Sequence, residues 1–203
     1  MDSLKLIHPS TCLISGPTGS GKTYFVKKLI DYEMFDPMPP TIVYCYGSYQ
    51  LLFQSMRNVQ FEDGLPPSIG SLRNALVIID DLMCELANNS QLSRLFTKGS
   101  HHRNLSVIFI TQNLFHQGKE MRNIHLNSHY MVLFKNPRDK SQIMHLAKQM
   151  YPGKSKSFQQ AFLDATLPEF GYLFIDLRPE TNDVCRLRTH IFDADKCVIH
   201  EPR

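Results

Sequence analysis

Apolar residues along the chain fall into two patterns, each typical of one kind of secondary structure. Short runs that are apolar nearly throughout indicate parallel strands buried on both faces. They occupy residues 11–15, 41–46, 75–79, 106–111 and 130–134. Segments with helical spacing of apolar residues occupy 24–34, 90–99, 139–150 and 158–165, and a further helix is expected within 47–59. Because strands and helices alternate, the pattern predicts an α/β fold with a mainly parallel sheet flanked by helices.

The last part of the chain departs from this alternation. Residues 172–177 and 186–192 indicate two strands that flank a turn, and the earlier stretch 62–70 is interpreted as a loop. No internal repeat, low-complexity tract or interdomain linker interrupts the sequence. We therefore expect one domain over residues 1–203, with its core at about residues 11–192.

Composition places the chain among ordinary globular proteins. Of its 203 residues, 42% are hydrophobic and 20% are charged. No apolar run approaches the roughly 20 residues of a membrane span, and residues 1–10 lack the apolar stretch of a signal peptide. The net charge of +3 is compatible with nucleic-acid binding but does not indicate it. The cysteines are odd in number and form no C-x-x-C pair, so we expect a reducing compartment and no zinc site.

The strongest chemical signal is a glycine-rich stretch directly after the first apolar run. It matches the phosphate-binding pattern G-x-x-x-x-G-K-[ST], and its residues are Gly16, Pro17, Thr18, Gly19, Ser20, Gly21, Lys22 and Thr23. In such a loop the glycines let successive backbone N–H groups point at the β-phosphate of a nucleotide. Lys22 is expected to reach the β- and γ-phosphates, and the hydroxyl of Thr23 is expected to hold Mg²⁺.

The setting of this motif distinguishes it from a glycine-rich surface turn. The apolar run 11–15 leads directly into the loop, and an amphipathic segment with Phe25, Val26, Leu29 and Ile30 on one face follows it. A strand, a glycine loop and a helix in this order form the context in which the motif binds phosphate. The sequence therefore predicts a site for ATP and Mg²⁺.

Polar residues also follow two other predicted strands. Asp80 and Asp81 come after residues 75–79, and Gln112 follows residues 106–111. Ligands of open α/β sheets bind beyond the carboxyl ends of the strands, so these side chains should converge on the phosphate loop. Asp80 takes the position of a Walker B carboxylate that orders Mg²⁺, and Asp81 is expected to polarise the attacking water, although both also fit an ordinary strand-end turn. Gln112 is expected to act as a sensor whose amide bridges the γ-phosphate or the lytic water to the rest of the protein.

A cation for the γ-phosphate in the transition state is the missing part of this set. Such an arginine finger can be supplied by a neighbouring subunit. The candidates are Arg103, Arg122 and Arg138, and each also fits a solvated surface position.

The segment 114–123 follows the expected sensor. It carries one aromatic residue, Phe115, with Lys119 and Arg122 around Gly118. We interpret it as a loop that either couples hydrolysis to contacts with the DNA backbone or belongs to the ordinary surface.

Four stretches of the sequence together resemble a known family. They are GPTGSGKT at residues 16–23, ALVIIDDL at 75–82, SHHRNLSVIFITQNLF at 100–115 and LNSHYMVLFKNPRDKSQI at 126–143. The set is similar to the genome-packaging ATPases of the FtsK–HerA superfamily, and above all to the poxvirus-type branch found in Polinton (Maverick) elements and related DNA viruses. Many enzymes share the phosphate loop, whereas residues 111–115 and 136–139 are more specific to this family. The resemblance spans about residues 11–192.

This resemblance implies a RecA-like ASCE P-loop NTPase in which the strand that ends before Gln112 lies between the phosphate-loop strand and the Asp80 strand. It implies a homo-oligomeric ring, commonly a hexamer, that pulls double-stranded DNA through its centre. In that superfamily the finger lies near the start of the sensor strand, which favours Arg103 acting in trans. One departure is that Asp81 stands where members often carry Glu, so its shorter side chain would need closer placement or a bridging water.

The resemblance also implies a location and partners. We expect an intracellular protein of the host cytoplasm or nucleus, with association with the virion as a further option. Because little sequence precedes residue 11, recognition of a genome end or capsid vertex is expected to come from the ring itself or from a capsid or portal-vertex protein.

Three functions remain in competition. The leading hypothesis is an ATP-hydrolysing double-stranded DNA translocase that packages a viral or transposon genome into a capsid. The second is a P-loop small-molecule kinase, which would need an arginine-rich lid and would lack the sensor Gln112. The third is a nucleotide-dependent assembly switch, against which the joint presence of Asp80, Asp81 and Gln112 argues.

Overall fold

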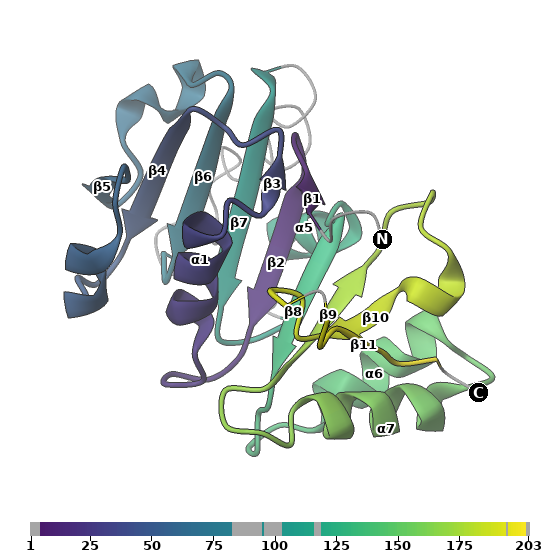
Figure 1. Cartoon of the computed structure of the whole chain (residues 1–203). Helices are drawn as coiled ribbons and strands as arrows, with labels where there is room; N and C mark the ends of the chain where they lie inside the picture. The colour runs from purple at the N-terminus through teal and green to yellow at the C-terminus, as the bar shows by residue number, and fades with distance from the viewer. Residues whose placement is uncertain (1–4, 83–94, 96–102, 116–118, 194, 202–203) are drawn as a thin grey trace.

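The computed structural model describes residues 5–82, 95, 103–115, 119–193 and 195–201. Within them, nine strands pair into one sheet in the order β11-β10-β9-β8-β2-β7-β6-β4-β5 (Figure 1). Neighbouring strands from β8 to β5 are parallel, whereas β9, β10 and β11 each run antiparallel to their neighbours. Their bounds are β2 (Thr11–Ser15), β4 (Thr41–Tyr46), β5 (Gln60–Asp63), β6 (Ala75–Asp80), β7 (Leu105–Thr111), β8 (Tyr130–Phe134), β9 (Tyr172–Asp176), β10 (Leu187–Thr189) and β11 (Val198–Ile199).

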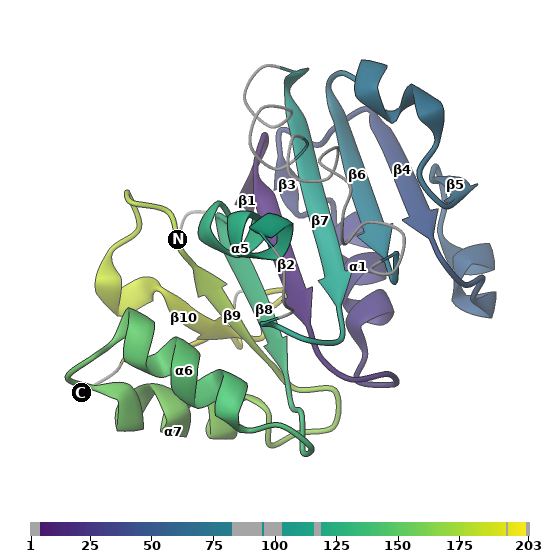
Figure 2. The same cartoon turned by 180° about the vertical axis from the view of Figure 1, so that it is seen from behind.

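Helices cover both faces of this sheet. Helix α1 (Lys22–Asp31) lies on one face, and α5 (Lys119–Leu126), α6 (Ser141–Met150) and α7 (Ser155–Ala165) lie on the other, as the two opposite views show (Figures 1 and 2). The remaining elements are the short parallel pair β1 (Leu6–Ile7) and β3 (Phe35–Asp36) and the 3₁₀ helices η1 (Leu51–Ser55), η2 (Pro67–Ser71) and η4 (Asp183–Cys185).

The core is divided between the two faces of the sheet. In β2, Leu13 packs into the cluster that contains residues of α6 and α7, whereas Cys12 and Ile14 pack with Phe25 of α1. Every residue of β2, β6 and β7 is buried. Burial on both faces explains why the central strands are apolar throughout instead of alternating.

The predicted α/β fold with a mainly parallel sheet is confirmed, as is the position of β7 between β2 and β6. The predicted central strands match β2, β4, β6, β7 and β8 to within one residue, and the late strands form the antiparallel pair β9 and β10. The helices predicted for 24–34, 139–150 and 158–165 correspond to α1, α6 and α7. The helix predicted for residues 90–99 lies outside the described residues except for Leu95, which is buried.

Three local expectations were wrong. The helix expected within residues 47–59 is the single 3₁₀ turn η1. The loop expected over 62–70 contains the end of β5 and most of η2. The strand was missed because β5 is a mostly exposed edge strand and lacks an apolar run. Part of the loop expected over 114–123 is helical, since α5 begins at Lys119 and buries Ile124. In the described part of the chain, no helix combines the length and the apolar character needed to cross a membrane.

Candidate functional site

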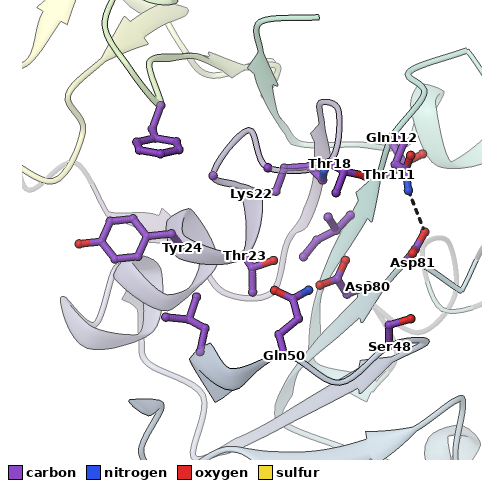
Figure 3. Close-up of a pocket in the computed structure, with 15 residues that line it drawn as sticks. Thr18, Lys22, Thr23, Tyr24, Ser48, Gln50, Asp80, Asp81, Thr111 and Gln112 are labelled. Carbon is purple, nitrogen blue, oxygen red and sulfur yellow. Dashed lines mark hydrogen bonds between the residues drawn. The ribbon is translucent and has the colours of Figure 1, made fainter. Parts of the chain in front are cut away.

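A cavity of about 530 Å³ opens at the carboxyl ends of β2, β6 and β7 (Figure 3). Cavities of this size hold small-molecule ligands in other proteins. Its described lining residues come from the glycine loop, the start of α1, the segment after β4, the ends of β6 and β7, and the loop before β9. They are Thr18, Gly19, Gly21, Lys22, Thr23, Tyr24, Ser48, Gln50, Leu52, Asp80, Asp81, Ile110, Thr111, Gln112 and Phe170. The convergence predicted from the three strand ends is therefore present.

The glycine loop ends in the first turn of α1. Gly21 caps the helix with a φ of 100°, a left-handed conformation that strongly favours glycine. The first backbone hydrogen bond of the helix runs from Phe25 N to Gly21 O at 2.9 Å. The N–H groups of the preceding helical residues have no partner within the helix, and together with the helix dipole they create a site for an anion such as phosphate.

Lys22 lies within the curve of this loop. Its Nζ donates to the carbonyl oxygens of Gly16 at 2.6 Å and Pro17 at 2.8 Å. Burial lowers the pKa of Lys22, and the negative charges of Asp80 and Asp81 partly oppose that effect. The loop is also joined to the sheet, because Gly16 N donates to Thr111 O at 3.2 Å. The ammonium group is thus positioned where the motif needs a cation for phosphate oxygens.

Asp80 is the most buried carboxylate of the cavity, with 5% of the residue exposed. Its Oδ2 accepts a hydrogen bond of 2.7 Å from the hydroxyl of Tyr44 on the neighbouring strand β4. Burial raises the pKa of Asp80 above its ordinary value, while hydrogen bonds from Tyr44 and Thr23 and the charge of Lys22 oppose that rise. The pKa of Tyr44 is raised by burial and by the nearby charge of Asp80, so its hydroxyl stays protonated and remains a donor.

The donor set of Thr23 and Asp80 fits Mg²⁺. Both present oxygen atoms to the same side of the cavity, next to the glycine loop (Figure 3). Hydroxyl and carboxylate oxygens are hard ligands of the kind Mg²⁺ prefers, and Mg²⁺ keeps several of its waters when only one or two protein groups hold it.

Asp81 and Gln112 meet on the other side of the cavity from the start of α1. Gln112 Nε2 donates to Asp81 Oδ1 at 3.4 Å, across the ends of β6 and β7 (Figure 3). Asp81 is exposed and has a φ of 57°, in the left-handed region that Asp tolerates better than most residues. The strand-end turn considered from the sequence is therefore real, and it turns the carboxylate toward Gln112.

The arginine candidates lie away from this cavity. Arg103 precedes β7, at the opposite end of that strand from Gln112, and its Nη1 donates to the carbonyl oxygens of Ile69, at 3.4 Å, and Gly70. Arg122 on α5 and Arg138 before α6 are both exposed. None of the three is among the described lining residues, so the role of Arg103 in a neighbouring site stays a prediction.

Sequence reasoning missed three aromatic residues of the site. Tyr44 lies inside the apolar run 41–46 and was treated as core, and its contact with Asp80 depends on β4 lying beside β6. Tyr24 follows the motif directly, and Phe170 lies in a distant loop. The adjacency of Tyr24 to Thr23 was the only signal in the sequence that could have indicated any of the three.

The sheet order, the glycine loop and the strand-end carboxylates together define an α/β fold of the P-loop type, with a mainly parallel sheet flanked by helices. No family model and no curated protein sequence matches the chain.

Solved structures share the fold. The genome packaging NTPase B204 from Sulfolobus turreted icosahedral virus 2, in complex with ATP-γS, has 13% identity and a TM-score of 0.60, covering 96% of this chain and 97% of its own. Its complex with AMP has 12% identity and a TM-score of 0.58, covering 96% and 98%. B204, the DNA-packaging ATPase from Sulfolobus Turreted Icosahedral Virus, has 13% identity and a TM-score of 0.55, covering the whole of both chains. At such identities the likeness shows the fold.

Proposed function

We propose that the chain is an ATP-hydrolysing double-stranded DNA translocase that packages a viral or transposon genome into a capsid. The observation that carries this proposal is the meeting of the glycine loop, Asp80, Asp81 and Gln112 in one cavity. The fold supports it as well, because it is shared over nearly the whole chain with NTPases that package viral genomes.

The polar groups predicted from the sequence each have a role in phosphoryl transfer to water. The backbone N–H groups at the start of α1 and the Lys22 ammonium bind the phosphates of ATP and leave the γ-phosphate facing Asp81 and Gln112. Asp81 accepts the proton of the attacking water, and Gln112 orients that water. Thr23, and Asp80 through water molecules, would hold Mg²⁺, which would supply positive charge to offset that of the phosphates.

A ring would supply the arginine that is absent from the described lining residues of the cavity. In a homo-oligomeric ring, which we propose to be a hexamer around double-stranded DNA, Arg103 of one subunit faces the nucleotide of the next. We retain the FtsK–HerA superfamily, and its poxvirus-type branch, as the proposed relationship. The further partner is a capsid or portal-vertex protein, and the location is the host cytoplasm or nucleus, or the virion.

The two alternatives predict different sites. A small-molecule kinase would need an arginine-rich lid, and no arginine is among the described residues that line the cavity. An assembly switch would not need a carboxylate and an amide paired beside the γ-phosphate position, as Asp81 and Gln112 are.

The test is the steady-state rate of ATP hydrolysis with and without long double-stranded DNA, with Lys22→Ala as the blank. A translocating motor should hydrolyse ATP several-fold faster on DNA, because hydrolysis is coupled to contacts with the backbone. Turnover that is indifferent to DNA would favour the kinase, and nucleotide binding without turnover would favour the switch.

A further inference from the structure

The end of the cavity where the γ-phosphate belongs is fixed by Asp81 and Gln112. The base of a nucleotide must then extend to the other side of the glycine loop. Figure 3 shows Tyr24 on that side, far from Asp81 and Gln112. The loop before β9 that carries Phe170 lies there too, since β8 and β9 are on one side of β2 in the sheet and β7 and β6 are on the other.

Two large rings are exposed at this end of the cavity. Tyr24 is 52% exposed and Phe170 is 56% exposed, although both line a concave site. The polar lining side chains labelled in Figure 3, Tyr24 apart, gather around Asp80 and at the phosphate end. At this end, a nucleotide base would therefore meet the faces of two aromatic rings. Few side-chain groups there could form hydrogen bonds with the edge of the base.

The position of Phe170 is held by its surroundings. Its φ of 56° is an outlier for a bulky residue, and such conformations persist where the neighbouring structure imposes them. The next residue must be glycine, because a Cβ on Gly171 would lie 2.6 Å from Ala165 O. The ring of Phe170 also lies against the glycine loop, since a Cβ on Gly21 would be 3.1 Å from its Cδ1.

A buried aromatic pair places the two exposed rings. Phe25 follows Tyr24 in α1, Tyr172 lies two residues after Phe170, and the two ring centroids are 4.7 Å apart. Tyr24 is oriented further by Lys28, one turn along α1, whose Nζ lies 5.3 Å from the centre of its ring. The rings are thus held in place at the start of α1 by contacts within the protein.

We propose that Tyr24 and Phe170 form the nucleobase subsite of this cavity and bind a purine by stacking, with little discrimination between adenine and guanine. Stacking depends on the area and polarisability of the base, so the larger purines should bind better than pyrimidines. This inference rests on the part of the proposed function that assigns nucleotide binding to the cavity, with the γ-phosphate at Asp81 and Gln112, and it does not depend on DNA translocation.

The experiment measures dissociation constants of ATP, GTP, CTP and inorganic tripolyphosphate, with Mg²⁺, for the full chain and its variants by titration calorimetry. Tyr24→Ala and Phe170→Ala should each weaken ATP and GTP binding by about tenfold and leave tripolyphosphate binding unchanged, because the proposal places the base, and not the phosphates, against these rings. Tyr24→Phe and Phe170→Tyr keep an aromatic face and should bind ATP as the wild type does. Leu163→Ala is the matched control, since Leu163 is 52% exposed on α7 and does not line the cavity.

Three results would overturn the inference. They are unchanged ATP affinity in both alanine variants, an equal loss for ATP and tripolyphosphate, and a wild-type preference between ATP and GTP of more than about tenfold. The failure of the proposed function looks different. If the wild type and Lys22→Ala bind ATP equally poorly, nucleotide binding itself is refuted, whatever the aromatic variants do.

Discussion

At the scale of single residues, the buried carboxylate of the site depends on a neutral donor. Asp80 accepts its 2.7 Å hydrogen bond from Tyr44, a phenol whose raised pKa keeps its proton in place. A hydroxyl on one oxygen fixes the orientation of the carboxylate without neutralising its charge. Under the proposed function, a carboxylate oriented in this way would accept hydrogen bonds from the waters of Mg²⁺.

Replacement of this donor tests its positioning role. We expect Tyr44→Phe to raise the Mg²⁺ concentration for half-maximal ATP hydrolysis by roughly tenfold, because hydrogen bonds to charged groups are worth about 1.5–3 kcal/mol. A titration of the hydrolysis rate with Mg²⁺ at saturating ATP measures this. Tyr46→Phe, a substitution in the same strand, is the control. A Tyr44→Phe protein with the wild-type Mg²⁺ dependence would remove Tyr44 from the site.

Asp81 allows a substitution that changes its charge while keeping its shape. Asn tolerates the left-handed backbone at φ 57° as Asp does, and its side-chain oxygen can still accept from Gln112. Asp81→Asn should therefore bind ATP with the wild-type affinity and lose at least about 100-fold in turnover, since general-base catalysis contributes 10²–10⁴-fold. Single-turnover hydrolysis together with calorimetric binding separates the two effects. Undiminished turnover would show that another group accepts the proton.

The residues of this site differ in how far the sequence could predict them. Lys22, Thr23 and Asp80 follow from local patterns, because a motif and the end of an apolar run each specify a position. Tyr44 and Phe170 do not, since their roles depend on which strands are neighbours and on where a distant loop lies.

At the scale of elements, the antiparallel edge of the sheet is held by a different kind of contact. Asp176, at the end of β9, is almost fully buried and accepts two hydrogen bonds from the guanidinium of Arg178, Nε to Oδ1 at 3.0 Å and Nη2 to Oδ2 at 2.8 Å. Burial by itself would raise the pKa of Asp176, because it disfavours the charged carboxylate. The hydrogen bonds and the positive charge of Arg178 lower that pKa by more, so it lies below its ordinary value. A two-point contact of this kind fixes geometry as well as charge.

The sign of this shift gives a prediction for stability against pH. A lowered pKa in the folded state adds stability that is present above the unfolded pKa of about 3.9 and is lost as the pH falls through the folded pKa. Asp176→Asn should thus cost about 1–3 kcal/mol of unfolding free energy at pH 7, and this difference should shrink below about pH 4. Urea unfolding between pH 7 and pH 3 measures it.

Asp183→Asn provides the comparison for this pair. Asp183 also accepts from an arginine, Arg186, but its side chain is 85% exposed. Exposed pairs contribute little, so its substitution should change the unfolding free energy by less than about 1 kcal/mol. Equal effects of the two variants would mean that burial adds nothing to the contact of Asp176.

Strands were easier to predict from the sequence than the elements around them. The central strands β2, β4, β6, β7 and β8 are buried on both faces, so their apolar runs stand out. The edge strand β5 has mostly exposed residues and no such run, and the 3₁₀ turns are too short to show a period. The ease of predicting an element from apolar residues thus depends on how deeply the element is buried rather than on its type.

At the scale of the whole molecule, Arg103 and the cavity of its own chain lie at opposite ends of the strand β7. Arg103 lies at the amino end of β7, whereas Gln112 follows the carboxyl end, so the two are separated by the full length of the strand. The same chain can therefore contribute Arg103 to one site and the glycine loop to another only if copies are arranged head to tail, as in a closed ring.

A mixture of two inactive proteins tests this arrangement. Lys22→Ala should bind nucleotide more weakly and hydrolyse none, and Arg103→Ala should bind ATP normally but hydrolyse it at least 10³-fold more slowly in assembled rings. When both are mixed in equal amounts, some sites lie between one subunit of each kind. Such a site is complete when the Arg103→Ala subunit supplies the intact glycine loop with Lys22 and the neighbouring Lys22→Ala subunit supplies the intact Arg103. Random mixing makes about a quarter of the sites complete, so hydrolysis should recover to a comparable fraction if sites act independently. If the mixture is as inactive as its components although rings form, Arg103 does not act across the interface, and its bonds to the carbonyl oxygens of Ile69 and Gly70 are its structural role.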